Sequence, residues 1–366
     1  MTGHAGRPAL SVVVMGYRNE TTISGAVLSV LQQERDEAIE VLVVTSGRDR
    51  SAEVVRDRYP AVSVIESANR LLPGAARNAG VRAARGEFVA FLAADCRAAP
   101  GWVAARLTAH RAGYAVVAGA VMPEEPGYAA AWAGHYLLFP SRLTGAQSEE
   151  VAYPDDRAHG LSYARESFER MGPFREDIRI GEDTEMARRL RDGGIRIWLA
   201  ADAVITHRGP RRICGLVRDQ YLRGLRNAKF VGPPPPRAWS RTRAVLGAVR
   251  GTGERLRWSQ QRVLALAPDH RRNLVRVGPW MVAGLLGHQV GWARARVAAI
   301  TATRRQGKSP LGEPARSVGA SSSPHPVTAT ALNAPNEATS TAMKIFRRAA
   351  RRGGRSCEFA LWSRRD

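Results

Sequence analysis

Carboxylates and one histidine stand where they could do chemistry in the front part of this 366-residue chain. Three acids, Glu182, Asp183 and Glu185, fall within four positions. Carboxylates this close can raise one another's pKa, and one of them could then act as a general base. Asp95 and His207 each come shortly after an apolar run, and both side-chain types can bind a divalent cation. These residues are candidates for catalysis if the fold brings them together.

A regular alternation of apolar runs and helical segments is expected to position these residues. Strands are predicted at 10–15, 40–44, 62–65 and 88–92, and helices at 21–33, 51–59 and 74–84. This alternation indicates an α/β fold with a mostly parallel sheet and helices on both faces. Ligands of such sheets bind beyond the carboxyl ends of the strands. The loops at 16–20, 45–49 and 93–96 follow three of the strands, so we expect them to line one crevice.

The pattern is less regular after Asp95. Further elements are predicted as helices at about 102–112, 127–139, 166–171 and 184–194, and as strands at 114–122, 195–199 and 203–206. The helix over 127–139 is apolar all round, which is typical of a core helix.

Four clusters of residues, in order and spacing, resemble glycosyltransferase family 2, whose members have the GT-A fold. The clusters are VVVMGYRNE (12–20), residues 73–102, residues 160–177 with 181–190, and VITHRGP (204–210). Each cluster alone is weak, but four in register make a specific signal over about residues 9–210. The resemblance implies transfer of a sugar from a nucleotide-diphosphate sugar to an acceptor hydroxyl with inversion. It also implies assistance by a divalent cation and a place in cell-envelope, polysaccharide or glycolipid synthesis.

The resemblance implies a metal site at Asp95. The family usually carries Asp-x-Asp after the fourth strand, whereas this chain has Ala93-Ala94-Asp95 and lacks the first carboxylate. One carboxylate can serve, because Mg²⁺ keeps several waters and binds through one or two carboxylates plus phosphate oxygens. His207 corresponds to a histidine that ligates Mg²⁺ or Mn²⁺ in many members. The residues alone also allow Asp95 to cap the helix near Trp102.

The general base implied by the resemblance is Asp183, the aspartate of a Glu-Asp pair, with Glu182 beside it. In an inverting transfer the base takes the proton of the acceptor hydroxyl as that hydroxyl attacks the anomeric carbon. The residues alone also allow Asp183 to be a helix N-cap, with its acidic neighbours complementing the helix dipole. Both roles can hold together.

The nucleotide pocket departs further from the family pattern. Many members carry Asp-Asp-Gly-Ser after the second strand, and this chain has TSGRD (45–49), so the sequence does not indicate which base is bound. Tyr17 could stack on the base, and Arg77 suits a diphosphate, although a solvated helix residue is the alternative. The expected donor contacts are Gly16, Tyr17, Asn19, Glu20, Ser46, Arg77, Asn78 and Ala94. Gly160 and Ser162 are expected to shape the sugar and acceptor pocket.

Charge divides the chain. The net charge is +22, yet residues 1–210 hold 25 basic and 26 acidic side chains, against 30 and 7 in residues 211–366. We therefore expect a catalytic domain over 1–210, a basic helical extension over 211–304 and a disordered basic tail over 305–366, which is rich in Ser, Pro, Thr and Ala.

The extension contains a segment, 272–297, with an apolar centre, two tryptophans and arginines at each end. This composition is typical of an interfacial helix on an anionic membrane, and packing on the catalytic domain is the alternative. Its longest apolar run, 277–287, has 11 residues, against about 20 needed to span a bilayer. The N-terminus lacks the apolar stretch of a signal peptide. We expect a cytoplasmic protein that lies peripherally on the inner face of the cell membrane and acts on a glycan or a lipid-linked acceptor.

Two other functions remain open. A nucleic-acid-binding protein could use the basic part, but that part lacks aromatic interleaving, an RNP-like motif and zinc-ligand spacing. A catalytically dead relative that still binds the donor is suggested by Ala93 and by the altered base-reading loop. Retention of Asp95, Asp183 and His207 argues for an enzyme.

Overall fold

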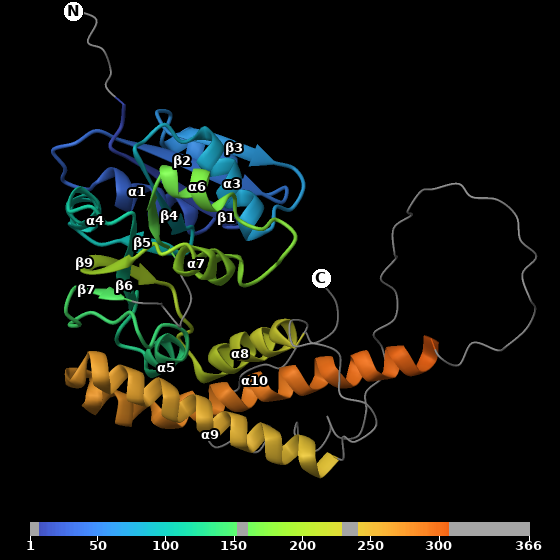
Figure 1. Ribbon diagram of the computed structural model, residues 1–366. Coiled ribbons are helices and arrows are strands. Elements are labelled where there is room, and N and C mark those ends of the chain that lie inside the picture. The colour runs from blue at the N-terminus through green and yellow to red at the C-terminus, as the bar shows by residue number, and fades with distance from the viewer. Residues whose placement is uncertain (1–6, 152–159, 229–240, 307–366) are drawn as a thin grey trace, which may run out of the picture. The chain divides into compact units, whose positions relative to one another are not determined.

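The computed structural model describes residues 7–151, 160–228 and 241–306 (Figure 1). The described residues of Met1–Asp219 and Gly247–Leu286 form one compact unit, and those of Gln220–Leu246 and Gly287–Asp366 form a second. The tail predicted over 305–366 lies outside the described residues from position 307 onward. That residues 1–210 suffice for catalysis stays a prediction.

Nine strands of the described residues form one sheet in the order β3-β2-β1-β4-β8-β6-β9-β5, with β7 paired to β9. The strands are β1 Leu10–Tyr17, β2 Ile39–Ser46, β3 Ser63–Ser67, β4 Phe88–Ala93, β5 Cys96–Ala98, β6 Val116–Pro123, β7 Glu149–Val151, β8 Ser162–Ala164 and β9 Ile197–His207. The first four strands are parallel, as predicted. Beyond β4 the sheet is mixed, because β8 runs antiparallel to both β4 and β6, and β9 runs antiparallel to β5 and β7.

The two strands predicted at 195–199 and 203–206 are one strand, β9. Both segments pair in parallel with β6, and an irregularity in the register between Gly119 and Val121 absorbs the residues that separate them. The sequence prediction was wrong on this point because such a bulge depends on the partner strand.

Helices cover both faces of the sheet (Figure 1). The helices of this region are α1 Ile23–Leu31, α2 Ser51–Arg58, α3 Pro73–Ala83, α4 Trp102–Arg111, α5 Ala129–Leu138, α6 Glu166–Met171 and α7 Glu182–Asp192. Alternate residues of β1 face opposite sides: Val12 and Val14 pack in one core with α1 and α4, and Val13 packs in another with α7. This period of two is what a strand buried on both faces requires.

A third core joins α5 to the helical extension within the first unit. The extension comprises α8 Ile213–Asn227, α9 Arg241–Leu266, the short 3₁₀ helix η1 Pro268–His270, and α10 Arg271–Gln306. Tyr136 and Leu137 of α5 are buried together with Val263 of α9 and with Val277 and Met281 of α10. The part of 272–297 that lies in this unit therefore buries an apolar stripe against the catalytic region, as the packing alternative predicted. Among the described residues, no helix has both the length and the apolar character needed to cross a membrane.

The second unit contains a close crossing of α8 and α10. A Cβ atom added at Gly224 would collide with the carbonyl oxygen of His288, and one at Gly291 with that of Tyr221. The Arg294 guanidinium also donates to the Tyr221 hydroxyl at 3.0 Å. Glycine is needed at both positions because the two backbones touch there.

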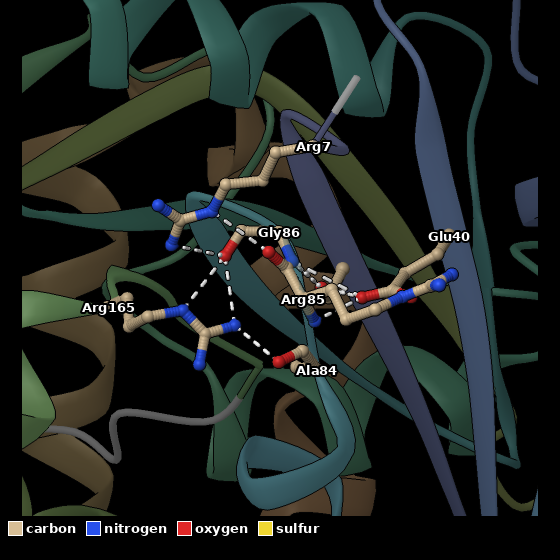
Figure 2. Close-up of polar contacts among 7 residues, drawn as sticks. Arg7, Glu40, Ala84, Arg85, Gly86 and Arg165 are labelled. Carbon is tan, nitrogen blue, oxygen red and sulfur yellow. Dashed lines mark hydrogen bonds and ion pairs between the residues drawn. The ribbon is translucent and has the colours of Figure 1, made fainter. Parts of the chain in front are cut away.

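Polar contacts fasten the turn between α3 and β4. Figure 2 shows the Arg165 guanidinium donating to the carbonyl oxygens of Ala84 at 2.5 Å and of Gly86 at 3.0 Å. On the other side of the turn, the Glu40 carboxylate accepts from the Arg85 side chain at 2.9 Å and from the Gly86 amide at 3.2 Å. These bonds satisfy backbone groups of the turn and link it to Glu40 of β2 and to Arg165, which follows β8.

Candidate active site

The loops predicted to line one crevice do meet at the carboxyl edge of the parallel strands. Tyr17 at the end of β1 lies opposite Ser46 at the end of β2. The amide of Ala94, after β4, donates to the carbonyl of Met15 at 2.8 Å, and the amide of Asn19 donates to the Ser51 hydroxyl at 3.1 Å. Parallel register brings these chain segments together, as the strand order requires.

A cluster of possible metal ligands lies beside this edge. One carboxylate oxygen of Asp95, the thiol of Cys96 and one imidazole nitrogen of His207 all lie within 4.8 Å of one another. Nε2 of His207 is 3.8 Å from the Asp95 carboxylate. Asp95 is about half exposed and His207 is mostly covered, so an ion bound between them could still reach a ligand from solvent.

Two strands hold this cluster. Cys96 of β5 lies opposite His207 of β9, and the amide of Arg208 donates to the carbonyl of Asp95 at 3.0 Å. The helix that follows, α4, begins after Gly101, which is its N-cap. The alternative in which Asp95 caps this helix is therefore wrong, because a β-strand lies between them.

Asp95 and His207 offer ligand atoms that suit Mg²⁺ or Mn²⁺. A carboxylate oxygen and a neutral imidazole suit both ions, which also accept water and phosphate oxygens as further ligands. Cys96 suits neither ion, because a thiolate is soft and because burial, and then the charge of Asp95, raise the pKa of this thiol well above its usual range. The interpretation of Cys96 as a packing residue agrees with its 1 % exposure.

Arg77 and Glu182 form an ion pair in the interior. Arg77 lies on α3 and is 4 % exposed, and its guanidinium also lies 5.7 Å from the Phe91 ring centroid and 5.4 Å from that of Phe174. Burial raises the pKa of Glu182, the charge of Arg77 opposes this, and the adjacent Asp183 adds to it, so the net direction is upward. The side chain of Arg77 is thus engaged inside the fold, and its predicted contact with a diphosphate stays a prediction.

Asp183 occupies the first turn of α7 without capping it. The helix begins at Glu182, and its N-cap is Gly181, which has φ 91°. One carboxylate oxygen of Asp183 accepts from the Thr184 amide at 2.7 Å. The N-cap alternative for Asp183 is therefore wrong, and the half-buried carboxylate retains an oxygen for which the structure shows no hydrogen bond among the described residues.

Asn78 holds the segment that precedes α7. Its side-chain amide donates to the Phe174 carbonyl at 2.9 Å, and its carbonyl accepts from the Phe174 amide at 2.9 Å. It also donates to the Glu176 carboxylate at 2.8 Å. With Arg77, it ties α3 to α7, which carries Asp183, and to the loop between α6 and α7, a link between distant residues that the sequence did not indicate.

Tyr17 lies in the loop expected to bind the base. Its ring packs against Gly47, where φ is 93° and an added Cβ would collide with the ring. The Arg70 guanidinium lies 4.3 Å from the centroid of the Tyr17 ring. The side-chain oxygen of Asn19 accepts a hydrogen bond from the Tyr17 amide at 2.8 Å. Glu20 is exposed at the end of this loop.

The other predicted contacts are buried or are backbone positions. Ser46 and Ala94 are 4 % and 2 % exposed, and Gly16 is half-buried beside Ala94, Asn19 and Ile23 of α1. The hydroxyl of Ser162 is fully buried and accepts from Arg106 at 2.9 Å, while the Gly160 carbonyl accepts from the same guanidinium at 2.8 Å. Donor and acceptor roles for these residues stay predictions.

Comparison with known proteins assigns the front part of the chain to a family. Residues 11–172 match the model of glycosyl transferase family 2. The chain carries a family 2 glycosyltransferase domain. The matched residues run from Ser11 of β1 through α6 and include Asp95 and the loops of the crevice, so the resemblance seen in the sequence is confirmed there. Asp183 and His207 lie beyond the matched residues.

Individual relatives agree with this family. EpsH from Bacillus subtilis, named as a glycosyltransferase, is 37 % identical over 92 residues, which are 24 % of this chain and 26 % of that protein. EpsJ from the same organism matches over the same lengths, so the chain spans about a quarter of these two curated relatives. The glycosyltransferase AglE from Haloferax volcanii is 27 % identical over 226 residues, 59 % of this chain and 72 % of AglE.

A solved structure shares the fold of the glycosyltransferase domain. The mannosyltransferase PcManGT from Pyrobaculum calidifontis, in complex with GDP-Man and Mn²⁺, superposes with a TM-score of 0.50 at 20 % identity, over 80 % of this chain and 88 % of that one. The predicted GT-A fold, an α/β sheet flanked by helices, is confirmed.

Proposed function

We propose that the chain moves a sugar from a nucleotide-diphosphate sugar to an acceptor hydroxyl, with inversion at the anomeric carbon and with help from Mg²⁺ or Mn²⁺. The observation that carries the proposal is the convergence of Asp95 and His207, 3.8 Å apart, at the carboxyl edge of a family 2 glycosyltransferase domain. PcManGT, a protein of similar fold, binds GDP-Man and Mn²⁺.

Asp95 and His207 are the proposed metal ligands. An ion bound there would neutralise the negative charge that develops on the leaving nucleoside diphosphate. The loop with Tyr17, Asn19 and Glu20, together with Gly16, Ser46 and Ala94, is the proposed surface for the nucleotide. With Ala93 in place of a first aspartate, phosphate oxygens and water would complete the ligand set of a bound ion.

Asp183 is the proposed general base. Its carboxylate is half-buried at the start of α7, on a helix anchored by the buried pair of Glu182 and Arg77. A base held this way keeps one orientation toward the acceptor hydroxyl and takes its proton during the attack. Attack from the face opposite the leaving group inverts the anomeric centre.

The proposed setting is the synthesis of a cell-envelope glycan or glycolipid on the inner face of the cell membrane. Support comes from the basic extension, which carries exposed arginines on the same helices whose apolar stripe packs on α5. Exposed arginines favour anionic lipid through charge alone. Release of the protein from membranes by high salt is the expected behaviour, and retention after carbonate extraction would contradict it.

The decisive experiment measures donor binding and donor hydrolysis with purified full chain. A thermal-shift screen of nucleotide sugars with Mn²⁺ should reveal one nucleotide family that raises the melting temperature, because ligands that bind the folded state stabilise it. Hydrolysis of that donor should require the metal and should vanish in EDTA. Donor binding without hydrolysis or transfer would instead support the catalytically dead relative that Ala93 suggests.

A further inference from the structure

A shallow pocket of about 540 Å³, widely open to solvent, lies between α5, η1 and the first turns of α10, within the first compact unit. The residues that matter for its chemistry are Trp132, Asp269, His270, Arg272, Asn273 and Arg276. None of them belongs to the metal cluster or to α7, so the proposed catalytic mechanism does not use this pocket.

The pocket presents cationic groups on a fixed frame. Arg272 and Arg276 are exposed, and among the described residues neither forms an ion pair with a carboxylate, although Arg276 donates to Asn273 at 2.8 Å. Asn273 in turn donates to the Tyr136 hydroxyl at 2.8 Å, and that hydroxyl lies 2.9 Å from Nδ1 of His270.

The charge balance of the pocket favours an anion. The pocket lining contains two arginines and one acid, Asp269. Burial lowers the pKa of His270, so this imidazole is neutral at pH 7. The arginines lie in the first turns of α10, where the helix dipole also favours negative charge. Trp132 forms part of the wall, and its indole N–H already donates to the Pro126 carbonyl at 2.8 Å.

Contacts connect this pocket to the metal cluster. Met122, which lines the pocket, pairs with Thr206 in the sheet, and the next pair along is Pro123 with His207. From His207 of β9, rings follow one another through Phe139, just after α5, to His135 and Trp132 on α5, with centroids 5.4, 5.7 and 5.6 Å apart. The pocket and the metal cluster thus lie at the two ends of one row of packed rings.

We propose that the pocket binds a phosphate or diphosphate group of the acceptor, through Arg272 and Arg276. The acceptor is then a phosphorylated or diphosphate-linked glycan, whether free or carried on a lipid. This proposal rests on the proposed function, because it names the acceptor of the same reaction. Arginine is suited to the task because its guanidinium can donate two parallel hydrogen bonds to phosphate oxygens.

Binding of inorganic pyrophosphate to the full chain in EDTA tests the pocket, measured by calorimetry. Arg272→Glu and Arg276→Glu should each weaken binding by about tenfold or more, since each removes a charge-assisted contact. Arg271→Glu is the matched control, because it makes the same charge change on the same helix at an exposed residue outside the pocket lining. Asp95→Asn should bind like wild type, which separates the pocket from the donor site.

Equal losses in Arg271→Glu and Arg272→Glu would overturn the proposal, because they would reveal a general charge effect. Loss of binding in Asp95→Asn would also overturn it. Circular dichroism checks that each variant is folded, and Arg272→Gln and Arg276→Gln repeat the test without charge reversal.

Competition identifies the source of the phosphate. A short-chain prenyl diphosphate that displaces pyrophosphate better than a hexose 1-phosphate indicates a lipid-linked acceptor, and the reverse order indicates a free one. Binding to phosphatidylglycerol vesicles without any pyrophosphate binding would overturn the pocket in favour of a membrane contact. Pyrophosphate binding needs no catalysis. If the protein binds pyrophosphate through Arg272 and Arg276 but transfers no sugar, the proposed function is refuted and the anion-binding pocket is not.

Discussion

Arg77 of α3 and Glu182 of α7 form an ion pair whose two side chains are only 5 % and 6 % exposed. The partners are 105 residues apart in sequence, and Asp183 is the next residue along from Glu182. The pair therefore fixes the start of the helix that carries the proposed base. Removal of one partner from a buried pair leaves a charge without compensation in the interior.

Glu182→Gln is expected to lower the free energy of unfolding by about 3–5 kcal/mol, as is usual when one partner of a buried pair is lost. Urea denaturation of the two proteins measures the difference. The control is Glu185→Gln on the same helix, whose partner Arg189 lies 2.8 Å away and whose pair is about a quarter exposed. That change should cost below about 1 kcal/mol. Equal costs would show that the buried pair does not anchor α7.

Asp183→Asn is expected to reduce turnover by about 10²–10⁴-fold, because it removes the proton acceptor while it keeps the shape of the side chain. Since Gly181 is the N-cap, the melting temperature and the donor affinity should stay near those of wild type. The anomeric configuration of the product, from NMR coupling constants, should be opposite to that of the donor. Wild-type turnover, or retention of configuration, would refute the mechanism.

Asp95→Asn should abolish metal-dependent donor hydrolysis, and His207→Ala should raise the Mn²⁺ concentration needed for half-maximal rate. Cys96→Ser is the control: it changes the third member of the cluster, whose soft sulfur suits neither Mg²⁺ nor Mn²⁺. Titration of each variant with Mn²⁺ checks these outcomes. Activity of the wild type in EDTA would show that no metal is needed.

Glu40→Gln is expected to destabilise the protein near neutral pH and to lose this effect in acid. Burial raises the pKa of Glu40, but hydrogen bonds from Ser11 and from the backbone and side chain of Arg85 outweigh it, so the pKa is lowered. A lowered pKa in the folded state gives stability that is present above the unfolded value, about 4.3, and is lost as the pH falls through the folded value.

Urea denaturation of wild type and Glu40→Gln between pH 7 and pH 3 measures the gap, which should narrow below about pH 5. Glu34→Gln serves as the control, since Glu34 is exposed and forms no ion pair among the described residues. A gap for Glu40→Gln that is constant with pH would show that the turn does not depend on the charge of this carboxylate.

The order of helices and strands in the front part could be predicted because their apolar periods are local. LSVVVM and FVAFL are buried strands in the structure, and ESFERM is a helix with the predicted limits. The proximity of Asp95 and His207 was also within reach, because both follow strands of the predicted fold.

Long-range partners could not be predicted in the same way. Arg77 was expected at the diphosphate, and nothing in its neighbourhood of the sequence points to Glu182. The antiparallel strand β8 has three residues, too few for a period to be recognised. The pocket at Arg272 and Arg276 arises only when α10 packs on α5, so it is a property of the tertiary structure.

The core shared by α5 and α10 sets an order of events during synthesis. Leu137 leaves the ribosome well before Val277, Met281 and Leu285, which cover the same face. At about 5–20 residues per second, the face of Leu137 stays uncovered for roughly 7–30 s before Val277 is synthesised. The glycosyltransferase domain is thus translated in full before α10 exists to cover α5. Until α10 is synthesised, the apolar face of α5 is exposed and can associate with other chains.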